Sequence, residues 1–239
     1  MMVIPTNKRC SMRPHFLVVA LTVLMSQITS AEITSDNNIR VVAESVLLMA
    51  DTPIGLDVGI SVNTKVRNKS GTDMEAAFRE TEGLLVGQRL RSEFERNDDW
   101  GVIRLFPEAS VIPQLNVQLS ILASDGRELV IETIVGAVTG ETILSAIYRD
   151  ISVGEDYTNE KSDPFADLYA TVVNDITDSL LSVSNQESYL RTLSSLRYAS
   201  ELVPEAFPNY LGQEAGLYSV RREPSPEDPM LIRLNRLRD

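Results

Sequence analysis

Three β-forming segments follow one another in the middle of the chain, and only two short turns separate them. They cover residues 115–122, 129–138 and 142–151. The first segment alternates apolar and polar side chains, which is typical of a strand with one buried face. Ser124-Asp125-Gly126 is a hairpin turn signal, and Thr139-Gly140-Glu141 supplies the second turn. This pattern predicts an antiparallel meander as the centre of the fold.

A strand and a long helix are predicted before the meander. Residues 57–66 alternate with period two, and Thr72 with Glu75 has the spacing of a capping box at the start of a helix that runs to about Arg96. The expected buried stripe of this helix comprises Met74, Phe78, Thr81 and Leu85, with Leu84 and Phe94 alongside. Gly83 and Gly87 lie four residues apart on one helix face, which predicts close packing of that face against a strand.

Several shorter elements complete this part of the chain. Trp100–Phe106 reads as a short strand that Pro107 ends, and Trp100 is interpreted as a plug in the core or at the sheet edge. Asp163-Pro164 has the N-cap and first-turn residues of a second helix. Its inward stripe comprises Phe165, Leu168, Tyr169, Val172, Val173, Ile176 and Leu180. Ile39–Met49 is apolar enough for a strand or a short helix, and both remain open.

The predicted fold class is α+β: a mixed sheet with an antiparallel meander, in the order β-α-β-β-β-β-α, plus a helical C-terminal extension. The α/β domain is expected at residues 39–183 and the extension at residues 186–239. Within the extension we expect a helix at 186–202, a short helix at 204–211, a small strand at 217–220 and a final amphipathic turn or two around 230–237.

The first 31 residues have the layout of a secretory signal peptide. Lys8, Arg9 and Arg13 form a basic region, Phe16–Met25 is an apolar run, and small residues lead to a predicted cleavage after Ala31. The run is too short for a bilayer span, which needs about 20 residues. We therefore expect export to the periplasm and a mature chain with no integral membrane span. The alternative is that residues 1–31 stay attached as an uncleaved anchor.

Residue usage excludes several kinds of chemistry. The one His and the one Cys, His15 and Cys10, both lie in the signal segment, so the mature chain cannot build a Ser-His-Asp triad, a Cys nucleophile or a His/Cys zinc site. No cofactor is predicted. Three of the 22 basic residues also lie there, which leaves 19 basic against 34 acidic residues. This acidity argues against a nucleic-acid partner, because phosphate binding needs positive charge.

The order of elements from Asp57 to Ser182 resembles a known family. It is carried by DVGISVNTKV, LRSEFERNDDWGVIRLF, QLNVQLSILASDGRELVIETIVGAVTGETILSAIYRDI and DPFADLYATVVNDITDSL. This order resembles the periplasmic domain shared by the TolB N-terminal region, CsgG and LpoB. The Thr-Gly-Glu turn within Val138–Ser145, followed by Tyr148, is similar to the turn of that family. The tail after Ser182 has no counterpart there. The resemblance implies an envelope protein–protein interaction module with no chemistry of its own.

Carboxylates are the main catalytic groups left, and they support an alternative function. A carboxylate-dependent hydrolase of an envelope polymer needs two facing carboxyl groups. The candidate pairs are Asp98/Asp99, Glu155/Asp156 and Asp163/Asp167. Their positions also suit a helix end, a solvated loop and an N-cap. A Ser-Lys dyad needs a Ser-x-x-Lys-like spacing, whereas Ser61 and Lys65 are four residues apart on one face of a predicted strand, and nothing else supports a dyad. Asp36-Asn37-Asn38 lacks the Gly and distal Glu of an EF-hand.

The tail holds the residues that we expect to bind a partner. They are Leu190, Leu193, Tyr198, Phe207 and Tyr210. These side chains either pack on the chain's own domain or dock an envelope or periplasmic protein in a helix-in-groove mode. Basic residues at 221, 222, 233, 236 and 238 either bind an acidic partner or face water. The favoured function is an exported, non-catalytic protein–protein interaction module. A purely structural role within a larger complex is the third reading.

Overall fold

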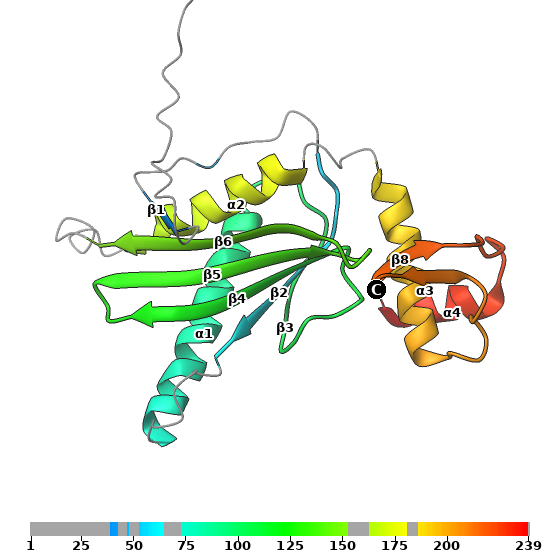
Figure 1. Ribbon diagram of the computed structural model, residues 1–239, viewed down its shortest axis with the longest axis horizontal. Helices are drawn as coiled ribbons and strands as arrows, with labels where there is room; N and C mark the ends of the chain where they lie inside the picture. Colours follow the sequence, from blue (N-terminus) through cyan, green and yellow to red (C-terminus); the bar gives the residue numbers. More distant parts are fainter. Residues whose placement is uncertain are drawn as a thin grey trace, which may run out of the picture. The chain divides into compact units, whose positions relative to one another are not determined.

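The computed structural model describes residues 39–42, 47, 53–64, 73–152, 163–180 and 186–238, with the backbone alone for 73–77. Its main sheet contains β1 (Ile39–Val41), β2 (Val58–Asn63), β3 (Ile103–Phe106), β4 (Leu115–Ser124), β5 (Glu128–Ala137) and β6 (Thr142–Ile151). The strand order is β1-β6-β5-β4-β2-β3 (Figure 1). The meander β4-β5-β6 is antiparallel, as predicted. The fold is α+β with a mixed sheet, because β2 runs parallel to both β3 and β4, and β1 runs parallel to β6.

The two turns of the meander form where the sequence predicts them. Gly126 and Gly140 adopt φ angles of +84° and +91°, a region that glycine enters without steric cost. In the first turn the carboxylate of Asp125 accepts hydrogen bonds from the backbone N–H groups of Arg127 and Glu128, at 2.9 and 2.8 Å. The same backbone donors lower the pKa of Asp125. These contacts fix the register of the hairpin.

Helices α1 (Asp73–Phe94) and α2 (Ala166–Leu180) cover one face of the sheet. The inward side chains of the meander alternate with outward ones, so that Val117, Val135 and Leu144 are buried and Gln118 and Ser145 on the opposite face are exposed. The predicted stripe of α2 is buried from Leu168 to Leu180, with Phe165 partly buried against it.

The start of α2 differs from the prediction. The helix begins at Ala166, three residues after Asp163, which lies in a preceding turn. The carboxylate of Asp163 accepts the N–H of Phe165 at 2.9 Å and pairs with Arg89 of α1 at 2.8 Å. Asp163 therefore stabilises the turn into α2 and ties the two helices together.

The helix α1 and the strand β3 are also shorter than predicted. The helix ends at Phe94 and β3 begins at Ile103. Trp100 lies between them as a buried plug, with its ring edge-on to that of Phe94 at a centroid distance of 4.9 Å. The predicted capping residue Thr72 lies outside the described residues, as do the whole signal segment and most of residues 43–52.

The C-terminal segment contains α3 (Glu187–Leu202), β7 (Leu211–Glu214), β8 (Leu217–Val220) and α4 (Pro229–Arg238). The predicted short helix at 204–211 is wrong, because Pro204 and Pro208 interrupt the chain there and turns take its place. The segment is therefore not purely helical: β7 and β8 form a hairpin whose turn residues, Ala215 and Gly216, have positive φ angles.

Side chains of α3 hold this segment against loops at one end of the sheet. Ser194 Oγ donates to the carbonyl of Ile112 at 2.7 Å. Arg197 Nη1 donates to the carbonyl of Val138 at 2.6 Å, and Arg191 contacts the carbonyl of Gly55. Leu190 of the same helix belongs to the main core. The segment thus completes the core of the α/β domain.

Candidate functional site

The tail residues predicted to bind a partner lie mostly inside the fold. Leu190 and Leu193 are 2% and 0% exposed within the main core. Phe207 is buried in a second cluster, and its ring lies 5.6 Å from that of Tyr210. Tyr198 and Tyr210 are only partly buried. Of the two roles left open by the sequence, packing on the chain's own domain is the one seen for Leu190 and Leu193. Phe207 packs against other residues of the C-terminal segment, so none of these three side chains offers a surface to a partner.

The apolar stripe of α1, by contrast, faces solvent. Phe78, Leu84 and Leu85 are 73%, 63% and 54% exposed. The prediction that these three side chains are buried is wrong, and Thr81 is exposed as well. Phe94 of the same predicted stripe is buried as expected, and the side chain of Met74 lies outside the described residues. The face that packs on the sheet carries Val86 and Leu90, together with the two predicted glycines. Exposed large apolar side chains that gather on one helix form a candidate docking surface.

Gly83 and Gly87 explain why α1 is turned this way. A Cβ atom at Gly83 would lie 2.3 Å from Cγ2 of Thr64, and one at Gly87 would lie 3.2 Å from side chains of Val62 and Leu105. The prediction that the glycine face packs closely on a strand is therefore confirmed. At 100° per residue, Gly83 and Leu85 point in nearly opposite directions, so burying the glycines exposes the apolar stripe.

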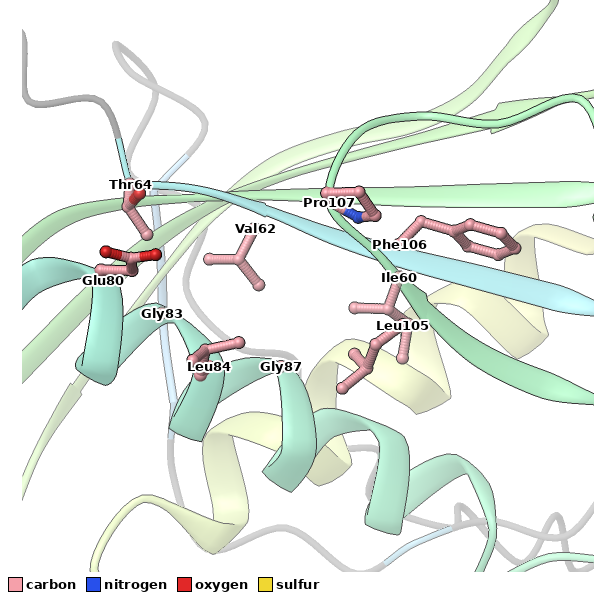
Figure 2. A pocket seen from close by; sticks show the side chains of 10 residues that line it. All are labelled: Ile60, Val62, Thr64, Glu80, Gly83, Leu84, Gly87, Leu105, Phe106 and Pro107. Atoms are coloured by element: carbon pink, nitrogen blue, oxygen red, sulfur yellow. The ribbon is translucent and has the colours of Figure 1, made fainter.

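A groove of about 210 Å³ lies between α1 and the end of β2, and Leu84 is the member of the exposed stripe that borders it. Figure 2 shows Thr64 and Glu80 at one end of the groove and Phe106 at the other. Its lining residues are Ile60, Val62, Thr64, Glu80, Gly83, Leu84, Gly87, Leu105, Phe106 and Pro107. Apart from Glu80, the large side chains are apolar. Leu84 lies about 100° round the helix from both Gly83 and Leu85, so it connects the groove to the exposed apolar side chains, whereas Phe78 and Leu85 project from the other side of α1.

The groove exists because β3 is shorter than β2. The paired register of the two strands ends at Ser61 and Phe106, and Pro107 follows at once. Strand β2 continues to Asn63 alongside β4. Proline lacks the N–H group that a ladder needs, so it ends β3 and opens the space beside Val62. Val62, Leu105 and Phe106 were not identified from the sequence as residues that line a groove. Pro107 could have indicated them, because a proline that ends β3 leaves the neighbouring side chains uncovered.

A polar cluster at the opposite edge of the sheet has a structural role. Tyr148 Oη donates to Asp175 Oδ2 at 2.8 Å, and Arg40 of β1 pairs with the same carboxylate. Burial, followed by the charge of Asp175, raises the pKa of Tyr148. Burial also raises the pKa of Tyr169, with Asp163 as the next cause. The cluster fastens β1 to β6 and α2.

Neither of the two candidate carboxylate pairs that the structure describes, Asp98/Asp99 and Asp163/Asp167, lines the groove. Asp99 is buried and Asp98 is exposed after the end of α1, where the latter lines a different hollow. Asp163 is engaged with Arg89 and the Phe165 N–H. The pair at residues 155 and 156 lies outside the described residues, as do Lys65 and residues 36–38. No observation in the described chain favours the hydrolase hypothesis.

The basic residues that the sequence analysis singled out in the tail lie mostly at its surface. Arg221, Arg222, Arg233 and Arg236 are exposed. Arg238 is partly buried, and its guanidinium lies 3.4 Å from Ser194 Oγ. The sequence left open whether these residues bind an acidic partner or face water, and exposure is compatible with both.

Comparison with known proteins gives no matching family model, no similar curated protein and no similar solved structure. Among the described helices, none combines the length and the apolar character needed to cross a membrane. In the same part of the chain, no group of three or more His, Cys, Asp or Glu side chains is placed to hold a metal ion. The functional interpretation therefore depends on the surface of α1 and the groove beside it.

Proposed function

We propose that this chain is an exported protein–protein interaction module of the cell envelope, without catalytic activity of its own. Its docking face consists of Phe78, Leu84 and Leu85 on α1 together with the adjacent groove. The exposure of these three large apolar side chains carries the proposal. Full burial of such a side chain is worth about 1.5–3 kcal/mol, so a partner that covers them gains affinity.

The groove adds shape to this apolar surface. Interfaces concentrate their binding energy in a few side chains that enter desolvated pockets, with weaker contacts around them. A hollow walled by Val62, Leu105 and Phe106 can receive such a side chain, and Leu84 at its border supplies adjoining apolar contact area. This combination supports docking of a folded or extended protein segment.

Features of the sequence support the other parts of the proposal. The basic, apolar and small-residue zones of residues 1–31 support export. The confinement of His and Cys to that segment supports a role without chemistry, and the acidic balance favours a protein partner over nucleic acid. The resemblance of residues 57–182 to the TolB N-terminal, CsgG and LpoB domain also supports an envelope module.

Site-specific photo-cross-linking in the native host cell tests the proposal. A photoreactive amino acid replaces Phe78 in the full-length chain, and in a control chain it replaces Leu122 of β4, which is 49% exposed. We expect a defined protein adduct from position 78 and none from position 122, because only the first position lies in the docking face.

The same experiment in a variant background shows whether the face itself causes the capture. The pair Leu84→Ser and Leu85→Ser should abolish the adduct from position 78, whereas Leu202→Ser, at another exposed apolar position, should leave it intact. Equal adducts from positions 78 and 122, or an adduct that survives the double substitution, would sink the proposal.

A further inference from the structure

The groove carries one negative charge, at a defined end. Glu80 is the ionisable residue of its lining, and its carboxylate lies beside Thr64 (Figure 2). The side chain is exposed, and no described residue forms an ion pair with it. A carboxylate that borders an apolar hollow favours a cation placed next to an apolar group.

A second acid lies close to the same end of β2. Glu108 is exposed and lines a neighbouring hollow of about 300 Å³, which shares Val62, Thr64 and Pro107 with the groove. The basic residue nearest in sequence to Glu80, Arg79, is engaged with Glu82 at 3.0 Å. The groove therefore has acidic residues at its border and no basic residue in its lining.

The size of the groove sets the apolar part of its occupant. An apolar cavity of about 150 Å³ is already large enough to bind benzene. At about 210 Å³ the groove has room for one aromatic or branched aliphatic side chain. The net charge of the domain also favours an occupant with a basic residue beside its apolar side chain. Residues 32–185 contain 26 acidic and 12 basic residues, so they attract positively charged segments from a distance.

We propose that the partner segment that enters the groove carries one large apolar side chain next to a lysine or arginine, and that the cation pairs with Glu80. This inference rests on the proposed function and specifies its ligand. The apolar side chain fills the space between Val62 and Leu105, and the basic residue extends toward the Thr64 end.

Selection from a phage-displayed library of random short peptides tests this assignment. The bait is the mature chain, residues 32–239, and peptides that also bind the Leu84→Asp variant are removed. We expect the remaining peptides to share an aromatic or aliphatic residue adjacent to Lys or Arg. Groove-dependent peptides without a basic residue would overturn this inference and leave the proposed function standing.

A charge-reversed bait sharpens the result. Selection on Glu80→Lys should lose the basic residue from the enriched peptides, whereas Glu214→Lys, an exposed position on β7 with the same change in net charge, should select as the wild type does. For a labelled selected peptide, Glu80→Gln should raise the Kd about two- to fivefold, as expected for a partly exposed ion pair, and this effect should fade in high salt. An unchanged Kd would overturn the pairing with Glu80.

Two further outcomes separate this inference from the proposed function. If no peptide depends on the groove, both fail, because the face then takes no protein segment. If the mature chain sediments as a dimer that Leu84→Asp dissociates, a second copy occupies the face and the peptide assignment is wrong. Thermal unfolding of each variant confirms that the bait is folded.

Discussion

Gly83 lies where α1 closely approaches the end of β2 and the residue that follows it, Thr64. Its hydrogen occupies the place where any other side chain would meet Cγ2 of Thr64 at 2.3 Å. Gly87, one turn further along, has 3.2 Å to its nearest neighbours. Both glycines therefore allow α1 to pack closely on the sheet, but a larger side chain fits less well at Gly83 than at Gly87. The sequence alone does not distinguish the two positions.

Gly83→Ala should make the protein less stable than Gly87→Ala by about 1–2 kcal/mol. Both changes gain up to about 1 kcal/mol of helix propensity, but only the first forces an overlap that must be relieved by moving neighbouring groups. Urea unfolding measures the difference. Adding Thr64→Ser, which removes Cγ2, should restore most of the loss in Gly83→Ala. Equal stability of the two alanine variants would contradict the tight contact.

The buried hydroxyl of Tyr148 predicts a loss of stability in alkali. Burial and Asp175 raise its pKa above the ordinary value of 10.0, so the folded chain keeps a proton that the unfolded chain releases. The stabilisation is complete below pH 10 and declines as the pH rises above it. Over the interval from pH 10 to 11, wild type should lose about 1 kcal/mol more than Tyr148→Phe, measured by denaturant unfolding. Parallel curves for the two proteins would contradict this role.

Helix α1 shows where an element could and could not be predicted from its residues. Its existence and the packing of its glycine face followed from capping and spacing, but the apolar stripe was assigned to the same buried side. Gly83 and Leu85 lie on opposite faces of a helix, so the two predictions could not both hold. Close approach to the sheet decided the orientation, since only the glycine face fits against Val62 and Thr64.

The orientation of α1 can be tested by stability. Leu84→Ser with Leu85→Ser should lower the free energy of unfolding by less than about 1 kcal/mol, because both side chains already face solvent. Leu90→Ala, at a fully buried position of the same helix, should cost about 2–5 kcal/mol. A large cost for the exposed pair would mean that the stripe is buried after all.

Over the whole molecule, the sequence predicts the order of helices and strands along the chain better than it predicts which of them pair or pack together. The meander followed from its turns, since consecutive antiparallel strands pair directly. The place of β2 between β3 and β4, and of β1 beside β6, depends on crossovers that no local pattern records. The same limit applies to the tail: the stripe of α3 marks Leu190 and Leu193 as buried side chains, but it does not say whether they pack on this chain or on a partner.

Removal of the tail should therefore unfold the protein and not only free it from a partner. A chain of residues 32–185 lacks Leu190 and Leu193, each worth about 1.5–3 kcal/mol of burial, against a typical total stability of about 5–15 kcal/mol. It also loses the hydrogen bond of Arg197 to Val138. We expect this fragment to show no cooperative thermal transition by circular dichroism and to be cut rapidly by protease. A sharp transition near that of the mature chain would show that the tail is dispensable.

The place of β2 in the sheet also has a mechanical consequence. The proposed docking face lies on α1, which packs directly on β2, and β2 is an inner strand with hydrogen-bonded ladders to both β3 and β4. A tensile load from a bound partner would therefore enter the sheet at an inner strand, where two ladders share it in shear, and not at an edge that can be peeled away bond by bond.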